Sequence, residues 1–181
     1  MKKLLIGLFV FILLIIVAAT QFGIQIGNVR IGKQMDLKIK QDINFEESNF
    51  YKVYYSSNKL TILNLWATWC VPCIKELPDF DSIHTVYKNQ NVKVLLVSLD
   101  FTEDIEKKVM PFLKKKNTKS EVVVLDEVNG NYFIPKISEA WTGAIPATLI
   151  VNNKKQKHCF FEKKLDYLFL KNQIELIEQL K

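Results

Sequence analysis

The first strong pattern along the chain is an apolar run close to its N-terminus. Lys2 and Lys3 are followed by sixteen residues, Leu4 to Ala19, none of which has a charged or polar side chain. A membrane-spanning helix needs about 20 mainly apolar residues, so this run lies at the short end of the usual range of about 17–25. We therefore expect residues 1–20 to direct the chain to a membrane.

This leader can be a membrane anchor or a cleaved signal peptide. A signal peptide has an apolar region of about 7–15 residues and small residues at its cleavage site, and Val17-Ala18-Ala19 would serve as such a site. We favour an uncleaved transmembrane helix, because the apolar run is long for a signal. If the leader is cleaved, the remainder would be a soluble secreted or periplasmic protein. Basic residues flank the run on both sides, so charge alone does not decide its orientation.

The next segment, residues 21–58, has a mixed alternation of apolar and polar positions. We interpret residues 21–35 as a tether and place the folded domain over residues 36–181. One or two short strands are expected in this segment, as an N-terminal extension of that domain.

From residue 60 onward the pattern predicts alternating strands and helices. Short runs of mainly apolar residues predict strands at 60–66, 92–99, 122–125 and 147–151, and a further strand is expected at 157–161, after the turn-like Asn152-Asn153. Apolar positions three or four residues apart predict helices after Cys70 (Ile74, Leu77, Phe80, Ile83, Tyr87) and over 105–113, 137–141 and 167–177. Pro78 is expected to kink the first helix and Pro111 to bend the second. The alternation predicts an α/β fold with helices on both faces of a sheet.

Length and charge narrow the function classes. The chain has 181 residues, which fits one domain of ordinary size plus an appendage. Its net charge is +6, and the basic excess is mostly Lys scattered along the chain, without interleaved Arg and aromatic residues. Scattered Lys usually forms a solvated surface, so we predict no nucleic-acid interface.

The candidate chemistry lies in the motif Cys70-Val71-Pro72-Cys73. If a helix begins at Cys70, both sulfurs lie within bonding reach in its first turn. The unpaired N–H groups and the positive end of the helix dipole then favour a thiolate on Cys70. Cys73 is expected to be more buried and to act second, by resolving the mixed disulfide that Cys70 forms. Pro72 fits near the first helical position, where no backbone donor is needed.

Other uses of this motif are less well supported. A zinc site needs a second pair of ligands, and Cys159, His84 and His158 are too few and poorly spaced to supply it. Attachment of haem needs a His directly after the second Cys, where this chain has Ile74. A structural disulfide stays possible, although a domain of this size can bury its own core. We interpret Cys159 as a small buried hydrophobic residue.

The surroundings of the motif resemble a known family. The residues Leu63-Asn64-Leu65-Trp66-Ala67-Thr68-Trp69-Cys70-Val71-Pro72-Cys73, followed by Lys75-Glu76-Leu77-Pro78, are similar to the thioredoxin-like, membrane-anchored bacterial reductases related to the cytochrome c maturation thioredoxins. The resemblance implies a thioredoxin fold, in which helices flank a central mixed sheet, with an N-terminal β extension and a transmembrane helix. It also implies that the domain lies outside the cytoplasm.

The same resemblance implies roles for several residues. Pro146 matches the family's cis-proline that faces the cysteine pair, and the backbone of Ile145 would pair with an extended substrate segment. Trp69 would cover the disulfide. Glu76 matches a buried acidic residue that could accept a proton from Cys73, although a surface Glu is the alternative. Asn64 stands where ordinary thioredoxins have a buried Asp, which makes Glu76 more important.

We therefore predict a thiol–disulfide oxidoreductase that uses the Cys70–Cys73 dithiol and needs no metal or other cofactor. The Val-Pro dipeptide has no His to stabilise the reduced form, so we favour a reductase over an oxidase or isomerase. The resemblance suggests apocytochrome c as a protein substrate and a transmembrane electron donor as a partner. Two other activities on this fold fit less well. A peroxidase of this fold requires Pro and Thr at the positions of Leu63 and Ala67. A copper-binding chaperone requires three residues between the cysteines, where this chain has two.

Overall fold

The structure is a computed structural model that describes residues 25–26, 29–30, 39–42, 59–125 and 127–179. The chain divides into two units, Met1–Leu37 and Lys38–Lys181. In the first unit, strands β1 (Gln25–Ile26) and β2 (Val29–Arg30) pair antiparallel. The apolar leader, residues 1–20, lies outside the described residues. Within the part that is described, no helix has the length and apolar character needed to cross a membrane.

The second unit is built on a six-stranded mixed sheet with the strand order β3-β6-β5-β4-β7-β8. Four neighbours run parallel: β3 (Ile39–Asp42), β6 (Glu121–Leu125), β5 (Val92–Ser98) and β4 (Leu60–Trp66). On the other side of β4, β7 (Ala147–Asn152) runs antiparallel, and β8 (Lys157–Phe161) runs antiparallel to β7. The strands predicted from residue 60 onward are confirmed, and β3 adds an N-terminal strand to the sheet.

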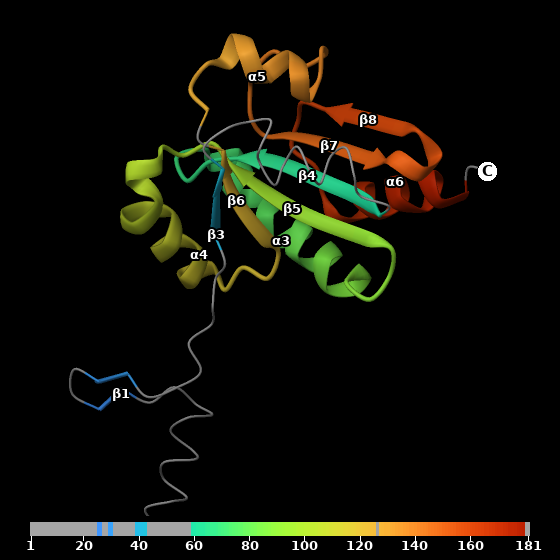
Figure 1. The fold of residues 1–181 in the computed structure, drawn as a ribbon. Coiled ribbons are helices and arrows are strands. Elements are labelled where there is room, and N and C mark those ends of the chain that lie inside the picture. The colour runs from blue at the N-terminus through green and yellow to red at the C-terminus, as the bar shows by residue number, and fades with distance from the viewer. Residues whose placement is uncertain (1–24, 27–28, 31–38, 43–58, 126, 180–181) are drawn as a thin grey trace, which may run out of the picture. The chain divides into compact units, whose positions relative to one another are not determined.

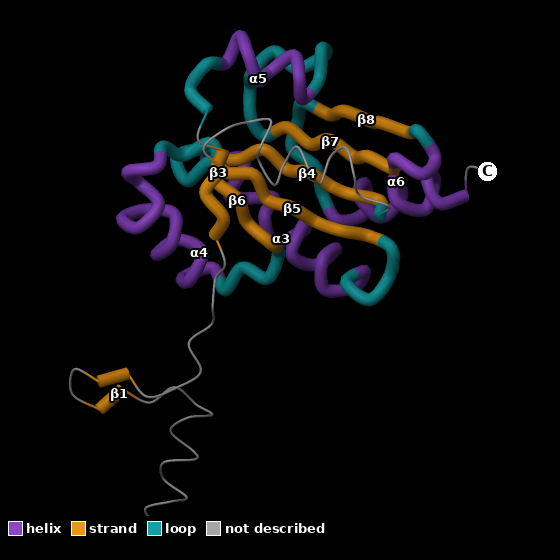
Figure 2. The backbone as a smooth tube through the Cα atoms, in the orientation of Figure 1, coloured by secondary structure: helices purple, strands orange, loops and turns teal. Residues whose placement is uncertain are grey.

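Helices cover both faces of this sheet. Figures 1 and 2 show α3 (Val71–Tyr87), α4 (Met110–Lys116) and α6 (Tyr167–Gln179) on one face and α5 (Gly130–Ile137) on the other. The connections also contain the short helical turns η1 (Thr102–Asp104), η2 (Ile105–Val109) and η3 (Asn153–Lys155). Because β4 lies between neighbours on both sides and helices on both faces, all seven of its residues are buried.

The core consists of two layers, one on each face of the sheet. Successive strand residues point to opposite faces, so every second residue of a strand faces the same layer. The α5 face buries Leu63, Leu65, Leu95, Val97, Val123, Leu125, Phe133, Ile137, Trp141, Ala147, Leu149 and Val151. The opposite layer includes the buried apolar residues of α3 and α6, namely Leu77, Phe80, Ile83, Leu170, Ile174 and Ile177.

Two helix predictions were wrong in detail. The helix expected over 137–141 is α5, which ends at Ile137 because Ser138 is extended. The helix expected over 105–113 is instead η2, a π-helical turn, followed by α4, which begins at Met110. Pro111 therefore lies in the first turn of α4, where its missing N–H costs little. Pro78 lies inside α3, which continues through it, and the kink stays a prediction.

We expect Phe80→Ala to be among the most destabilising core substitutions. Phe80 lies on α3 and has an exposed fraction of 0%. Truncation of a buried Phe costs about 3–5 kcal/mol, through lost transfer free energy and the cavity left behind. Urea unfolding followed by circular dichroism measures the change. Leu168→Ala is the control, because Leu168 on α6 is 67% exposed, and it should change stability by less than about 0.5 kcal/mol.

Candidate active site

The disulfide lies where the central strand meets the following helix. After β4 ends, a short turn leads to Cys70, whose backbone N–H bonds to the Ala67 carbonyl oxygen at 3.1 Å. Cys70 is the N-cap of α3 and is extended, and its Sγ accepts a hydrogen bond from the backbone N–H of Cys73 at 3.3 Å. The two cysteines are disulfide-bonded, with their Cα atoms 5.3 Å apart. The helix start predicted at Cys70 is confirmed.

The two sulfur-bearing residues differ in access. Cys73 has an exposed fraction of 0%, whereas Cys70 retains 5%. Two large apolar side chains next to Cys70 are exposed: Trp69 by 64% and Val71 by 60%. Trp69 is therefore not a core aromatic residue. Its role as a cover for the disulfide stays a prediction.

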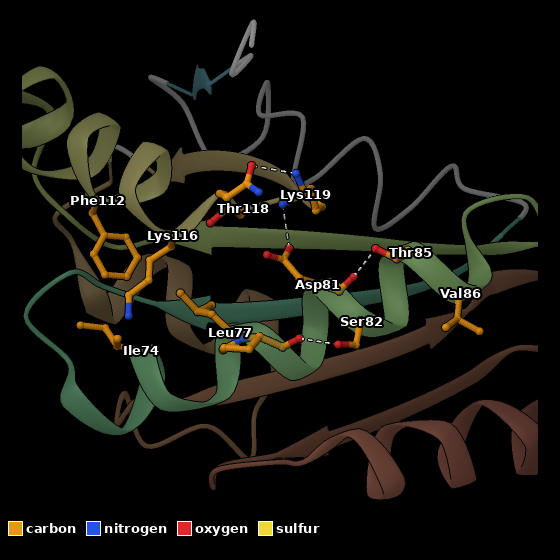
Figure 3. A pocket seen from close by; sticks show the side chains of 12 residues that line it. Ile74, Leu77, Asp81, Ser82, Thr85, Val86, Phe112, Lys116, Thr118 and Lys119 are labelled. Carbon is orange, nitrogen blue, oxygen red and sulfur yellow. Dashed lines mark hydrogen bonds between the residues drawn. The ribbon is translucent and has the colours of Figure 1, made fainter. Parts of the chain in front are cut away.

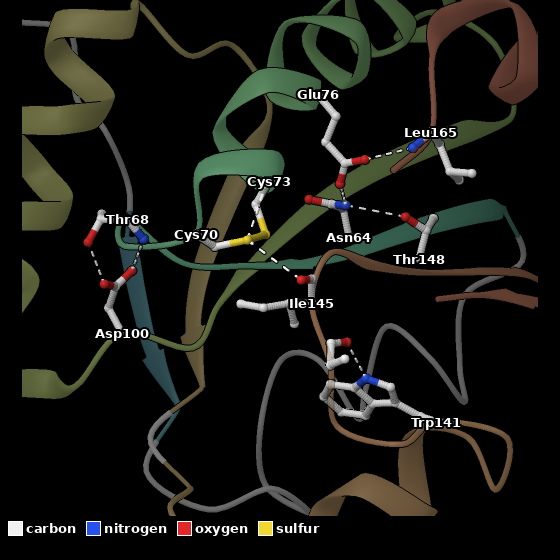
Figure 4. The surroundings of a disulfide bond; sticks show 11 residues. Asn64, Thr68, Cys70, Cys73, Glu76, Asp100, Trp141, Ile145, Thr148 and Leu165 are labelled. Carbon is white, nitrogen blue, oxygen red and sulfur yellow. Dashed lines mark hydrogen bonds between the residues drawn. A yellow bond between two sulfur atoms is a disulfide. The ribbon is translucent and has the colours of Figure 1, made fainter. Parts of the chain in front are cut away.

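A second loop approaches the disulfide from the start of β7. The Ile145–Pro146 peptide bond is cis, as the family resemblance predicted. The carbonyl oxygen of Ile145 lies 3.7 Å from Cys70 Sγ (Figure 4). Pro146 is buried and Ile145 half-buried, so the structure brings the predicted loop and the cysteine pair together.

This second loop is held from both sides. The indole Nε1 of Trp141 donates to the Ala144 carbonyl oxygen at 2.8 Å (Figure 4). The Glu162 carboxylate accepts from the backbone N–H groups of Thr142 and Ala144, each at 3.1 Å, and from the Thr142 hydroxyl. These bonds, with the Thr142 hydroxyl first among them, lower the pKa of Glu162.

Glu76 is buried one turn beyond Cys73, with an exposed fraction of 0%. The burial that the resemblance implied is therefore confirmed, and the alternative of a surface Glu is excluded. Its Oε1 accepts from Asn64 Nδ2 at 2.7 Å, and its Oε2 accepts from the backbone N–H of Leu165 at 2.8 Å (Figure 4). The Asn64 amide also donates to the Thr148 hydroxyl at 3.2 Å.

The environment of Glu76 favours its protonated form. Desolvation by burial is the largest effect and raises the pKa of Glu76 to about 7. The bonds from Leu165 and Asn64 and the charge of Lys164 act in the opposite direction, while Asp79 adds a smaller increase. The side chain can therefore exchange a proton near neutral pH, which is where a general acid or base works best.

Sequence reasoning missed several supporting residues. Leu165 and Thr148 contact the Glu76 network, and Glu162 holds the loop before Pro146. Asp100 bonds to Thr68 in the turn before Cys70. One usable signal existed for Asp100: it directly follows an apolar run, and the carboxyl ends of the parallel strands β4 and β5 meet at one edge of the sheet.

The remaining candidate ligands lie apart from the disulfide in the fold. His84 is on α3, while His158 and Cys159 are on β8. Cys159 is half-buried, so the expectation of a buried residue was only partly right. Among the residues described, no three or more His, Cys, Asp or Glu side chains gather closely enough to hold a metal ion.

A cleft of about 410 Å³ lies between α3 and α4 (Figure 3). Its walls include Leu77, Pro78, Ser82, Val86, Phe112 and Lys116. Neither of the paired cysteines nor Glu76 lines it, so we assign it no part in the redox site.

Comparison with known proteins agrees with this geometry. Residues 31–156 match the sequence model of the AhpC/TSA family. The chain is 36% identical over 100 residues to the thiol-disulfide oxidoreductase ResA of Oceanobacillus iheyensis, covering 51% of this chain and 52% of that protein. It is 34% identical over 97 residues to the sporulation thiol-disulfide oxidoreductase A of Bacillus subtilis, covering 52% of this chain and 53% of the relative. The matches thus span about half the length of these curated relatives.

Solved structures show the same fold. A thioredoxin-related protein from Neisseria meningitidis serogroup B superposes with a TM-score of 0.59 at 23% identity, covering 67% of this chain and 86% of the other. StoA from Bacillus subtilis superposes with a TM-score of 0.50 at 23% identity, covering 68% and 85%. The mixed sheet with flanking helices is therefore a thioredoxin fold.

Proposed function

We infer the function from the family: this chain belongs to the thioredoxin-like AhpC/TSA family, and we propose that it is a thiol–disulfide oxidoreductase working through Cys70 and Cys73. One observation carries the proposal. The two cysteines form a disulfide at the first turn of α3, with Cys70 as the N-cap and its sulfur 3.7 Å from the Ile145 carbonyl oxygen. A cysteine pair placed at a helix start, facing a second loop, suits exchange with an incoming disulfide.

The reaction begins with the reduced pair. The N–H groups at the start of α3 and the positive end of its dipole stabilise the thiolate of Cys70. This thiolate attacks one sulfur of a substrate disulfide, so that a mixed disulfide forms and the other substrate sulfur leaves as a thiolate that takes up a proton. Cys73, once deprotonated, then attacks the sulfur of Cys70 and releases the second substrate thiol. The substrate gains two electrons and two protons, and the pair ends as the disulfide.

Glu76 is the proposed proton acceptor for Cys73. It lies one helical turn beyond Cys73, and its pKa of about 7 lets a fraction of the side chains be ionised at neutral pH. A base of this strength can take the thiol proton of Cys73 and return it after resolution. Asn64 and the Leu165 N–H hold the carboxylate in place.

Substrate is proposed to bind at the exposed side of the disulfide. The backbone of Ile145 would pair with an extended substrate segment, as a strand adds to a sheet edge. The exposed side chains of Trp69 and Val71 give this segment an apolar surface beside Cys70. The substrates are therefore disulfide-containing proteins, with apocytochrome c the one suggested by the family resemblance.

We propose that the domain works outside the cytoplasm, held at a membrane by the apolar leader. In that location a transmembrane electron donor would re-reduce the pair. The reduced Cys70–Cys73 dithiol itself supplies the two electrons, so the reaction needs no metal or further cofactor.

The reductase direction is tested by the reduction potential of the Cys70–Cys73 pair. No His stands between the cysteines to stabilise the reduced form, so we expect a potential below about −180 mV, and the reduced chain should cleave the disulfides of insulin. Equilibration with glutathione buffers, followed by thiol alkylation, measures the potential. A value near about −120 mV, typical of strong oxidants, would contradict the reductase and favour an oxidase or isomerase.

A further inference from the structure

Asp100 is a buried carboxylate that the proposed mechanism does not use. It lies two residues past the end of β5 and has an exposed fraction of 2%. Its Oδ2 accepts from the Thr68 backbone N–H at 2.9 Å and its Oδ1 from the Thr68 hydroxyl at 2.6 Å (Figure 4). Its Oδ2 also accepts from the Ser98 hydroxyl at 2.7 Å. A buried carboxylate with three donors, two of them from one residue, fixes that residue firmly.

Thr68 belongs to the turn that delivers Cys70 to the helix. The turn begins at Ala67, whose carbonyl oxygen accepts from the Cys70 N–H at 3.1 Å. At its other side, β4 and β5 are in register to Trp66 and Ser98, and the Leu99 N–H donates to the Trp66 carbonyl oxygen at 2.8 Å. The bonds from Thr68 to Asp100 therefore continue the hydrogen bonding between β4 and β5 into the turn that follows β4.

We propose that Asp100 is a positioning residue for Cys70: by binding both the backbone and the hydroxyl of Thr68, it holds the turn so that Cys70 caps α3. This inference rests on the proposed function, in which the capping position lets the start of α3 stabilise the Cys70 thiolate of the reduced protein. Asp100 acts through Thr68 and does not need to touch the substrate.

The chain contains a matched control at a position further along α3. Asp81 also accepts three hydrogen bonds, from the Lys119 N–H at 3.1 Å, the Ser120 N–H at 2.9 Å and the Ser120 hydroxyl at 2.7 Å. Figure 3 shows Asp81 reaching the segment after α4. Loss of this carboxylate removes the same kind of bonds from α3 itself without touching the Cys70 turn.

The test measures the rate at which iodoacetamide alkylates Cys70 in the reduced, full-length chain, as a function of pH. Mass spectrometry of the peptide that contains Cys70 separates this reaction from those of Cys73 and Cys159. We expect Asp100→Ala to move the midpoint of the profile upward by roughly one pH unit, because the Cys70 thiolate loses part of its stabilisation by the N-terminus of α3. This shift corresponds to a roughly tenfold slower reaction at neutral pH. Asp81→Ala should leave the profile in place.

Asp100→Asn separates position from charge. Its amide oxygen can accept from the Thr68 N–H and the Ser98 hydroxyl, while its amide nitrogen donates to the Thr68 hydroxyl, which can also accept. The profile should therefore return to within about half a pH unit of that of the unmodified chain, a small residual shift by the scale of a single helix-end interaction. If Asp100→Ala does not fold, Thr68→Val removes one of the three bonds and should move the midpoint in the same direction by less.

Three outcomes would overturn the proposal. One is an unmoved profile in Asp100→Ala, or in Thr68→Val where that variant replaces it. Another is an equal shift in Asp81→Ala, which would assign the effect to general loosening of α3. The third is a shift in Asp100→Asn as large as that in Asp100→Ala, in either direction, which would assign it to charge. A Cys70 thiol that reacts no faster than free cysteine in the unmodified chain would instead overturn the proposed function.

Discussion

A chain carrying Cys73→Ala should accumulate covalent complexes with its protein substrates. The Cys70 thiolate can still attack a disulfide, but the thiol that resolves the mixed disulfide from within the same helix turn is gone. Reactions within one molecule commonly have effective molarities of about 10⁵ M or more, so the lifetime of the complex should rise by at least roughly a thousandfold. Non-reducing electrophoresis of cell extracts, followed by mass spectrometry of the slow-moving bands, measures the captured proteins.

The controls for this experiment come from the other two cysteines. Adding Cys70→Ala to the Cys73→Ala chain should remove every complex, because no attacking thiolate remains. Adding Cys159→Ser should leave the complexes unchanged, since Cys159 lies on β8 and is paired in register with Ile150 of β7. Complexes that persist without Cys70, or vanish without Cys159, would contradict the assignment of Cys70 as the attacking residue.

Glu76→Gln should slow disulfide reduction by roughly a hundredfold at neutral pH, the usual effect of losing a general base. The change should be greatest above pH 7, where Glu76 is ionised in the unmodified chain. The rate of insulin reduction, measured between pH 5 and 9, gives the size of the loss in rate. It also shows whether the rise in rate near pH 7, which reflects ionisation of Glu76, disappears in the variant. An unchanged profile would show that Glu76 takes no part in proton transfer.

Glu76→Gln should lower activity but raise stability at neutral and higher pH. The folded-state pKa of Glu76 is about 7, raised from an ordinary value of 4.5, so its contribution to stability is greatest below pH 4.5 and falls as pH rises to about 7. The fall amounts to about 3 kcal/mol, and Glu76→Gln should abolish it. Urea unfolding at pH 5 and pH 8 measures this. The free energy of unfolding of the variant, relative to that of the unmodified chain, should increase from pH 5 to pH 8. Glu103→Gln, which changes an exposed residue, should not alter this pH dependence.

Much of the fold was predictable because its signals are local. Strands β4, β5, β6 and β7 consist mainly of apolar residues, and α3 repeats its apolar positions every three or four residues. The cysteine pair was equally clear, since two residues between cysteines at a helix start allow few other uses. Periodicity, however, describes a helix face and not its ends. The helix predicted over 137–141 was therefore misplaced. Ser138 has an extended backbone that ends α5, and the pattern of apolar residues does not indicate this.

The supporting contacts of the site could not be predicted in the same way. Thr68 bonds to Asp100, which is 32 positions away in the sequence, and Asn64 bonds to Thr148, which is 84 positions away. Such pairs depend on how the strands are ordered in the sheet. The burial of Glu76 also depends on this order, because the Leu165 segment, which follows the last strand β8, must lie beside α3 to bond with it. The family resemblance indicated that Glu76 matters, but it did not identify what holds its carboxylate.

The bond between the Leu165 N–H and Glu76 joins residues 89 positions apart, just ahead of α6. An early stop codon upstream of Leu165 would consequently remove a donor from the proton-accepting group while leaving both cysteines in the chain. A chain that ends there would also lose α6 and its buried Leu170, Ile174 and Ile177, so we expect the fold and the proton-accepting site to be lost together. Activity would in this way report the integrity of the C-terminal end without any direct probe placed there.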